Sequence, residues 1–269
     1  MTVPSLSPEA PVGVFDSGLG GLSVLRHARA RLPADDFLYV ADSGNAPYGE
    51  RSAGWIRERS IELGHFLIGH GVKALLIACN TATAAAAQAL RERWPGLPVI
   101  GMEPAVKPAA AATRSGVVGV LATTGTLASA RFAALLDTVG RDIRVITRPG
   151  TGLVEAVERG ELDTPATRAL VASHITPLLA AGADTIVLGC THYPFLRTLI
   201  EQAAGPQVSV IDTGDAVARQ LARKLGEAGL LRAHGIGTER FWSSAPADAG
   251  EQVLRCMWRG DAAFEALPR

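Results

Sequence analysis

Residues 75–87 read LLIACNTATAAAA, and residues 185–196 read TIVLGCTHYPFL. In each stretch a short apolar run ends at a cysteine, Cys79 or Cys190, and a threonine follows within two residues. Short apolar runs bounded by polar residues are typical of buried strands. The two stretches therefore predict the same unit, a strand that ends at a cysteine and leads into a helix, once in each half of the chain.

The rest of the 269-residue chain alternates short apolar runs with longer amphipathic stretches. This alternation is typical of βα units and predicts an α/β fold with mostly parallel sheets. The predicted strands are 12–15, 37–41, 74–78, 99–102, 117–121, 144–147, 185–189, 208–211 and 240–243. Polar capping residues predict helix starts at Ser52, in the region 81–83, at Thr126, at Thr164 before Pro165, and at Thr213.

The duplicated unit predicts two pseudo-symmetric α/β domains. We place the first domain at residues 1–100 plus 213–269 and the second at residues 101–212. In open α/β sheets, ligands bind beyond the carboxyl ends of the strands. The active site is therefore expected in the cleft between the domains, where the strand ends of both halves would meet.

Composition narrows the classes of function. The chain has 26 basic and 26 acidic residues, so its formal net charge is zero, and it lacks the basic footprint of a protein that binds nucleic acid or an anionic membrane. No apolar run approaches the roughly 18 to 20 residues of a membrane span, and no basic segment precedes an apolar stretch at the N-terminus. We predict a cytoplasmic protein that acts on a small, roughly neutral molecule.

The chain has three cysteines and no CxxC pair, which argues against both a disulfide framework and a zinc site. Cys256 lies in a helical pattern, EQVLRCMW, and is interpreted as a packing residue. Cys79 and Cys190 each precede a helix start, and a helix N-terminus favours a thiolate. One such cysteine could be a small apolar residue, but two in matching places indicate a pair in which one takes a proton while the other gives one.

The stretch DSGLGG, residues 16–21, follows a strand and opens a helix. Its spacing is neither GxGxxG nor GxxxxGK[ST], and the acidic Asp16 would repel a phosphate. Two interpretations stay open: a glycine turn capped by Ser17, or an Asp16 that serves as a proton partner or binds a substrate ammonium group.

His192 lies two residues after Cys190 and is either its proton partner or a histidine that caps a helix or faces solvent. A metal site at this pair lacks further recognisable ligands. A hydrolase with a Cys and His pair is a stronger rival, but it leaves Cys79 unexplained. Backbone amides near Tyr48, with several hydroxyl and amide side chains, could bind a carboxylate without a fixed positive charge. These side chains are Ser17, Asn80, Thr81 and Thr191.

Seven motifs occur in order between residues 12 and 222: GVFDSGLGGLSV, YVADSGNAPYG, IACNTATA, VIGMEPAVKPA, GVLATTGTLAS, LVEAVERGEL and VLGCTHYP. In these motifs the chain resembles the cofactor-independent glutamate racemases. The resemblance implies two pseudo-symmetric α/β domains with the active site between them. It further implies racemisation of free glutamate by two bases, without pyridoxal phosphate or metal, to supply D-glutamate for peptidoglycan.

The resemblance also implies roles for individual residues. Cys79 would be the base toward D-glutamate, assisted by Asp16, and Cys190 the base toward L-glutamate, assisted by His192. The implied substrate contacts are Asp16, Ser17, Tyr48, Gly49, Asn80, Thr81, Thr124, Glu155, Thr191 and His192. A homodimer is expected for the family. The alternatives are a racemase of aspartate or another amino acid, a non-enzymatic amino-acid binding module, and a hydrolase that forms a thioester.

Overall fold

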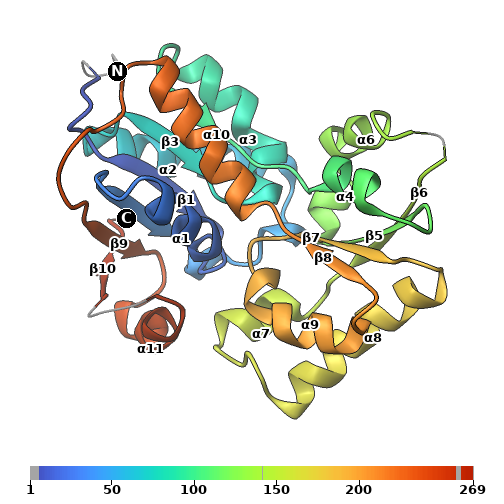
Figure 1. The fold of residues 1–269 in the computed structure, drawn as a ribbon. Helices are drawn as coiled ribbons and strands as arrows, with labels where there is room; N and C mark the ends of the chain where they lie inside the picture. The colour runs from blue at the N-terminus through green and yellow to red at the C-terminus, as the bar shows by residue number, and fades with distance from the viewer. Residues whose placement is uncertain (1–5, 141, 259–261, 269) are drawn as a thin grey trace.

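The computed structural model describes residues 6–140, 142–258 and 262–268, which form two sheets flanked by helices (Figure 1). The first sheet has the order β10-β9-β2-β1-β3-β4, and the second has the order β6-β5-β7-β8. Every strand pairing in the described part of the chain is parallel. The predicted α/β class with parallel sheets is confirmed.

The strands of the first sheet are β1 (Val12–Asp16), β2 (Phe37–Ala41), β3 (Ala74–Ile77), β4 (Val99–Ile100), β9 (Glu239–Ser243) and β10 (Phe264–Ala266). Those of the second are β5 (Val117–Ala122), β6 (Arg144–Pro149), β7 (Thr185–Gly189) and β8 (Ser209–Ile211). The orders β2-β1-β3-β4 and β6-β5-β7-β8 match position for position. The duplicated unit of the sequence therefore corresponds to β3 in one sheet and β7 in the other.

The longer helices are α1 (Leu22–Arg31), α2 (Ala53–Gly69), α3 (Asn80–Arg93), α8 (Pro165–Ala180), α9 (Arg197–Ala204), α10 (Gly214–Glu227) and α11 (Ala247–Met257). The shorter ones are α4 (Val106–Ala112), α5 (Thr124–Leu127), α6 (Ala130–Leu136) and α7 (Leu153–Glu158), with 3-10 turns η1 (Ser43–Asn45), η2 (Tyr48–Glu50) and η3 (Tyr193–Leu196).

The strands β1, β2 and β3 of the first sheet are buried on both faces, which explains why they read as continuous apolar runs. Successive residues of β1 point to opposite sides. Val14 joins the core that includes Leu25 of α1 and Leu221 of α10, whereas Phe15 joins the core formed with α2 and α3. Both side chains have no exposed surface. The two helical layers therefore fix β1, and with it the polar residue at its end.

Several predicted boundaries differ from the structure. The strand β10 was not predicted, and β4 and β8 are shorter than their predicted ranges. Thr126 lies inside α5, which Thr123 caps instead. Cys256 lies on α11 as predicted, but it is exposed and not packed. Ser52 and Thr164 cap α2 and α8 through their side chains, as the sequence predicted.

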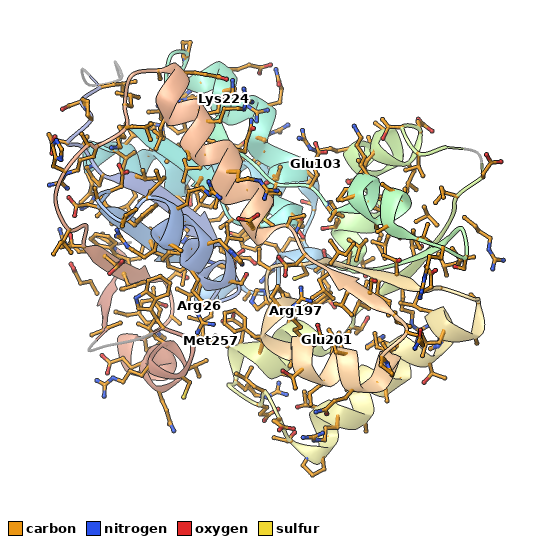
Figure 2. The ribbon with its side chains drawn as sticks, in the orientation of Figure 1. Arg26, Glu103, Arg197, Glu201, Lys224 and Met257 are labelled. Carbon is orange, nitrogen blue, oxygen red and sulfur yellow. The ribbon has the colours of Figure 1, made fainter. Side chains whose placement is uncertain are left out.

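The chain passes between the sheets twice, after β4 and after β8. At the second crossing, Asp212 accepts two hydrogen bonds, one from the N–H of Gly214 at 2.9 Å and one from Arg197 Nη2–H at 2.5 Å. Arg197 also binds Glu201, one turn along α9, at 3.0 Å (Figure 2).

The domain limits at 101 and 213 stay predictions. Among the described helices, none has the length and apolar character needed to cross a membrane.

Candidate active site

Polar residues gather where four strands end. Asp16 is the last residue of β1, Cys79 follows β3, Thr123 follows β5 and Cys190 follows β7. The carboxyl ends of both sheets thus contribute to one place, as the topology rule predicts. A small cavity, partly open to solvent, is lined there by Ser17, Pro47, Tyr48, Gly49, Cys79, Asn80, Thr81, Thr123, Val154, Cys190, Thr191 and His192. Both thiols face the same cavity.

The glycines of DSGLGG let side chains of the second half, Glu158 at the end of α7 and His192 after β7, approach the backbone of the first half. A Cβ atom at Gly18 would lie 2.1 Å from Glu158 Oε1, and one at Gly20 would lie 2.3 Å from His192 Nδ1. Both distances are far inside van der Waals contact, so a side chain at either position would displace its neighbour. The stretch is a close-packing loop between the two halves of the site.

Cys79 is the N-cap residue of α3. Its Sγ accepts the N–H of Ala82 at 3.4 Å and lies 3.7 Å from Ser17 Oγ. Burial raises the pKa of Cys79, and the negative charge of Asp16 raises it further. The helix N-terminus that we expected to favour a thiolate is present, but burial outweighs it. Cys79 is therefore a protonated thiol in the unliganded protein.

Asp16 is completely buried behind the cavity. Its Oδ2 accepts the N–H of Gly21 at 2.8 Å, while Oδ1 lies 3.4 Å from Ser17 Oγ and 3.5 Å from Thr191 Oγ1. Burial raises the pKa of Asp16, although the charge of His192 acts in the opposite direction. The suggested cap at Ser17 is wrong: α1 has no side-chain cap, and the Ser17 hydroxyl lies between Asp16 and the Cys79 thiol.

Cys190 is the first member of a chain of thiol, imidazole and carboxylate. Its Sγ lies 3.6 Å from His192 Nδ1, and His192 Nε2 lies 2.6 Å from Glu158 Oε1. Burial by itself would lower the pKa of His192, but the hydrogen bonds to Cys190 and Glu158 outweigh it and raise that pKa. The imidazole is therefore held as a cation beside the thiol, which supports the interpretation of His192 as its proton partner.

Glu158 is a site residue that was not predicted from the sequence. Glu155 was predicted instead. Glu155 lines a neighbouring depression and does not line the cavity. Residues three apart are neighbours on one side of a helix, so the sequence by itself does not distinguish the two glutamates of α7. Only Glu158, at the last turn, reaches His192. The motif LVEAVERGEL contained the signal, but it could not decide between the two positions.

Thr124 likewise lines the neighbouring depression, and its neighbour Thr123 lines the cavity. Thr123 Oγ1 lies 2.8 Å from Thr81 Oγ1 and 2.9 Å from Thr126 Oγ1, while Thr81 Oγ1 lies 3.1 Å from Thr126 Oγ1. These three hydroxyls join α3 of the first half to α5 of the second. They place a small group of donors and acceptors across the junction of the two halves.

Tyr48 lines the cavity, but its hydroxyl is already engaged. The Tyr48 Oη–H donates to Asp42 Oδ2 at 2.5 Å, and Asp42 also accepts hydrogen bonds from the Arg59 guanidinium. The contribution that Tyr48 can make to a ligand therefore comes from its ring and backbone, and not from its hydroxyl. Gly49, the next residue, lines the same wall of the cavity.

Asn80 is a buried polar residue in the wall of the cavity. Asn80 as a whole is 4% exposed, and among the residues that the structure describes neither Oδ1 nor Nδ2 has a hydrogen-bond partner. An unpaired buried polar group costs roughly 1 to 3 kcal/mol. Because Asn80 also lines the cavity, a polar ligand there would supply the missing partners.

Within the described ranges, no three His, Cys, Asp or Glu side chains are grouped so that they could hold a metal ion.

The profile of the family described as Asp/Glu/Hydantoin racemase matches residues 22–221. The chain belongs to the Asp/Glu/hydantoin racemase family. It is 61% identical to the glutamate racemase of Ectopseudomonas mendocina over 91% of this chain and 94% of that protein. This membership makes the chain an amino-acid racemase, an isomerase.

Solved structures agree with the family assignment. A glutamate racemase of Bacillus anthracis superposes with a TM-score of 0.89 at 30% identity, covering 97% of this chain and 98% of that one. The glutamate racemase of Escherichia coli, solved with L-glutamate and the activator UDP-MurNAc-Ala, gives a TM-score of 0.84 at 31% identity over 96% and 98% of the two chains. The racemase fold therefore extends over nearly the whole chain.

The close approach at Gly20 gives a test of this site. We expect Gly20→Ala to lower racemase activity by at least about tenfold, because the added methyl would push the His192 ring away from Cys190; overpacking of this kind costs roughly 1 to 3 kcal/mol. Gly54→Ala is the matched control, since nothing lies within 4 Å of its Cβ position. Steady-state rates and thermal unfolding of both variants check this, and wild-type activity in Gly20→Ala would contradict it.

Proposed function

We propose that this racemase interconverts L-glutamate and D-glutamate by a two-base mechanism that uses Cys79 and Cys190. The observation that carries the proposal is the position of both thiols on one small cavity, together with an Asn80 amide that has no hydrogen-bond partner in the described part of the chain. The relatives named glutamate racemase and the L-glutamate bound to the E. coli neighbour support glutamate as the substrate. Opposed thiols suit racemisation, because a single base would have to cross from one side of Cα to the other.

The proton transfers are as follows. With L-glutamate bound, the Cys190 thiolate first takes the Cα proton and becomes a thiol, which leaves a carbanion at Cα. Cys79 then gives its own proton to the opposite side of Cα and becomes a thiolate. The cationic His192, 3.6 Å from Cys190 Sγ, stabilises the starting thiolate. The buried thiol of Cys79 is the starting acid, in line with its raised pKa. D-glutamate reacts by the reverse steps.

Stabilisation of the carbanion must accompany the proton transfers. General acid–base catalysis contributes about 10²- to 10⁴-fold, which is too little to remove so weakly acidic a Cα proton. Preorganised donors aimed at the developing enolate-like carboxylate supply much of the rest. We assign this task to the Asn80 amide and the hydroxyls near Thr81 and Thr191, which line the cavity. Exclusion of water on closure would strengthen each of these contacts.

We further propose a cytoplasmic enzyme that supplies D-glutamate for peptidoglycan and that can form a homodimer. The relatives named glutamate racemase support D-glutamate as the product; the location, the pathway and the dimer follow from the family resemblance of the sequence. Gel filtration with light scattering tests the dimer. In a bacterium that lacks its own glutamate racemase and needs added D-glutamate to grow, expression of this protein should remove that need.

Incubation of the purified protein with L-glutamate, without any added cofactor, tests the proposed function directly. We expect D-glutamate to form until the two enantiomers are equal, with one deuterium at Cα when the solvent is D₂O. Parallel incubation with L-aspartate separates an aspartate racemase from a glutamate racemase. Absence of D-glutamate, or a covalent thioester on either cysteine in mass spectrometry, would contradict the proposal.

A further inference from the structure

Ser43 is a polar residue next to the site that the mechanism above does not use. It lies in η1, directly after β2, and its Oγ–H donates to Glu158 Oε2 at 2.9 Å. We infer that Ser43 is a positioning residue that holds Glu158 for the Cys190 half of the reaction. This inference rests on the proposed two-thiol function and names a further residue on which one of its two proton transfers depends.

The Glu158 carboxylate joins three separate segments. Its Oε1 receives the N–H of Leu19, in the loop after β1, and Nε2–H of His192, in the turn after β7, both at 2.6 Å. Its Oε2 receives the hydroxyl of Ser43. The carboxylate plane is thus set by donors on both oxygens. Because Oε1 is shared, a rotation of the carboxylate would lengthen the contact to His192.

The segment that carries Ser43 is itself firmly held. The preceding residue, Asp42, is completely buried and receives Tyr48 Oη–H at 2.5 Å and Arg59 Nε–H at 2.9 Å. The Asp42 backbone N–H also donates to the carbonyl of Asp16 at 3.0 Å. The charge-assisted contacts fix Asp42, and through it they place the Ser43 hydroxyl at Glu158 Oε2.

Removal of the Ser43 hydroxyl should affect one thiol and not the other. The terminal torsion of a glutamate is broad, and the Glu158 side chain is 16% exposed, so Oε2 would turn toward water once its partner is lost. His192 would then be held less firmly beside Cys190. Cys79 is not part of this hydrogen-bonded series, because its hydrogen-bond partners are Ser17 and the N–H of Ala82.

The test is Ser43→Ala, assayed with glutamate carrying deuterium at Cα. L- and D-glutamate have equal free energy, so kcat/KM must fall by the same factor in both directions, and we expect a factor of about ten for a lost hydrogen bond to a charged group. The primary isotope effects on kcat/KM show which of the two proton transfers has become slower. A slower Cys190 step makes abstraction from L-glutamate more rate-limiting, so that isotope effect should rise. The effect for D-glutamate, whose proton Cys79 removes, should fall.

Two further variants complete the experiment. Ser43→Thr keeps the hydroxyl and should restore both the rate and the isotope effects, while Ser173→Ala removes an exposed serine hydroxyl of α8 and should change neither. Wild-type kinetics in Ser43→Ala, or isotope effects that change equally for both enantiomers, would overturn the inference. If the wild-type protein forms no D-glutamate, the proposed function fails instead, so the two failures are distinguishable.

Discussion

Replacement of either Cys79 or Cys190 with alanine should lower racemisation of glutamate by at least about 10³-fold and leave the fold in place. The loss follows because each thiol is the sole proposed proton carrier on its side of Cα, and a positioned acid or base contributes about 10²- to 10⁴-fold. The fold should persist because each change removes one buried sulfur atom from a small side chain. Chirality-resolved product analysis and circular dichroism measure the two effects.

Cys256→Ala is the matched control for both variants. Cys256 is exposed on α11, so its replacement should leave the rate unchanged and show that loss of a thiol as such is harmless. The Cys79 and Cys190 variants should also lose racemisation to a similar extent. Each turnover removes a proton from one face of Cα and adds one to the other face, so both thiols are needed in either direction. Full turnover in either the Cys79 or the Cys190 variant would refute the two-base mechanism.

Glu158→Gln should lower kcat/KM by about 10²-fold, whereas Glu155→Gln should change it by less than about threefold. Glutamine keeps an oxygen that can accept the Nε2–H of His192 but removes the negative charge that helps to keep the imidazole cationic. Glu155 lies one turn earlier on the same helix face and lines only the neighbouring depression. Steady-state kinetics of the two variants, made with the same substitution, isolate the contact with His192.

The pH dependence of the same variant has a definite sign. The pKa of His192 is raised by Cys190 and Glu158, so its cation persists to higher pH than that of an ordinary histidine. Loss of the Glu158 charge lowers this pKa. The basic limb of kcat/KM against pH should therefore move to lower pH in Glu158→Gln and stay in place in Glu155→Gln. A basic limb that does not move would mean that His192 does not set it.

The pair Glu155 and Glu158 also shows where sequence reasoning stops. Both glutamates lie within one motif and on one face of α7, so periodicity treats them alike. The choice is made by Leu19 and His192, which approach from loops far away in the chain. The same holds for Thr123 and Thr124, whose difference depends on the distance to Thr81 across the junction.

Other expectations changed because a partner was invisible in the sequence. Tyr48 lines the cavity, and its hydroxyl binds the buried Asp42, a partner that the sequence does not reveal; its contact with substrate stays a prediction. Ser17 was a candidate helix cap, and its hydroxyl instead lies between Asp16 and Cys79. In each case the side chain has more than one polar group within reach. Long-range packing selects the partner, and local propensity carries no information about it.

The sequence by itself determined the α/β class, the duplicated strand ends and the two thiols with their immediate neighbours, because hydrophobic periodicity and capping are local properties of the chain. Only the tertiary structure decided that both thiols line one cavity, that burial keeps Cys79 protonated, and that Glu158 holds His192. Distances between residues far apart in the chain, and the desolvation that they produce, arise only when both halves pack together.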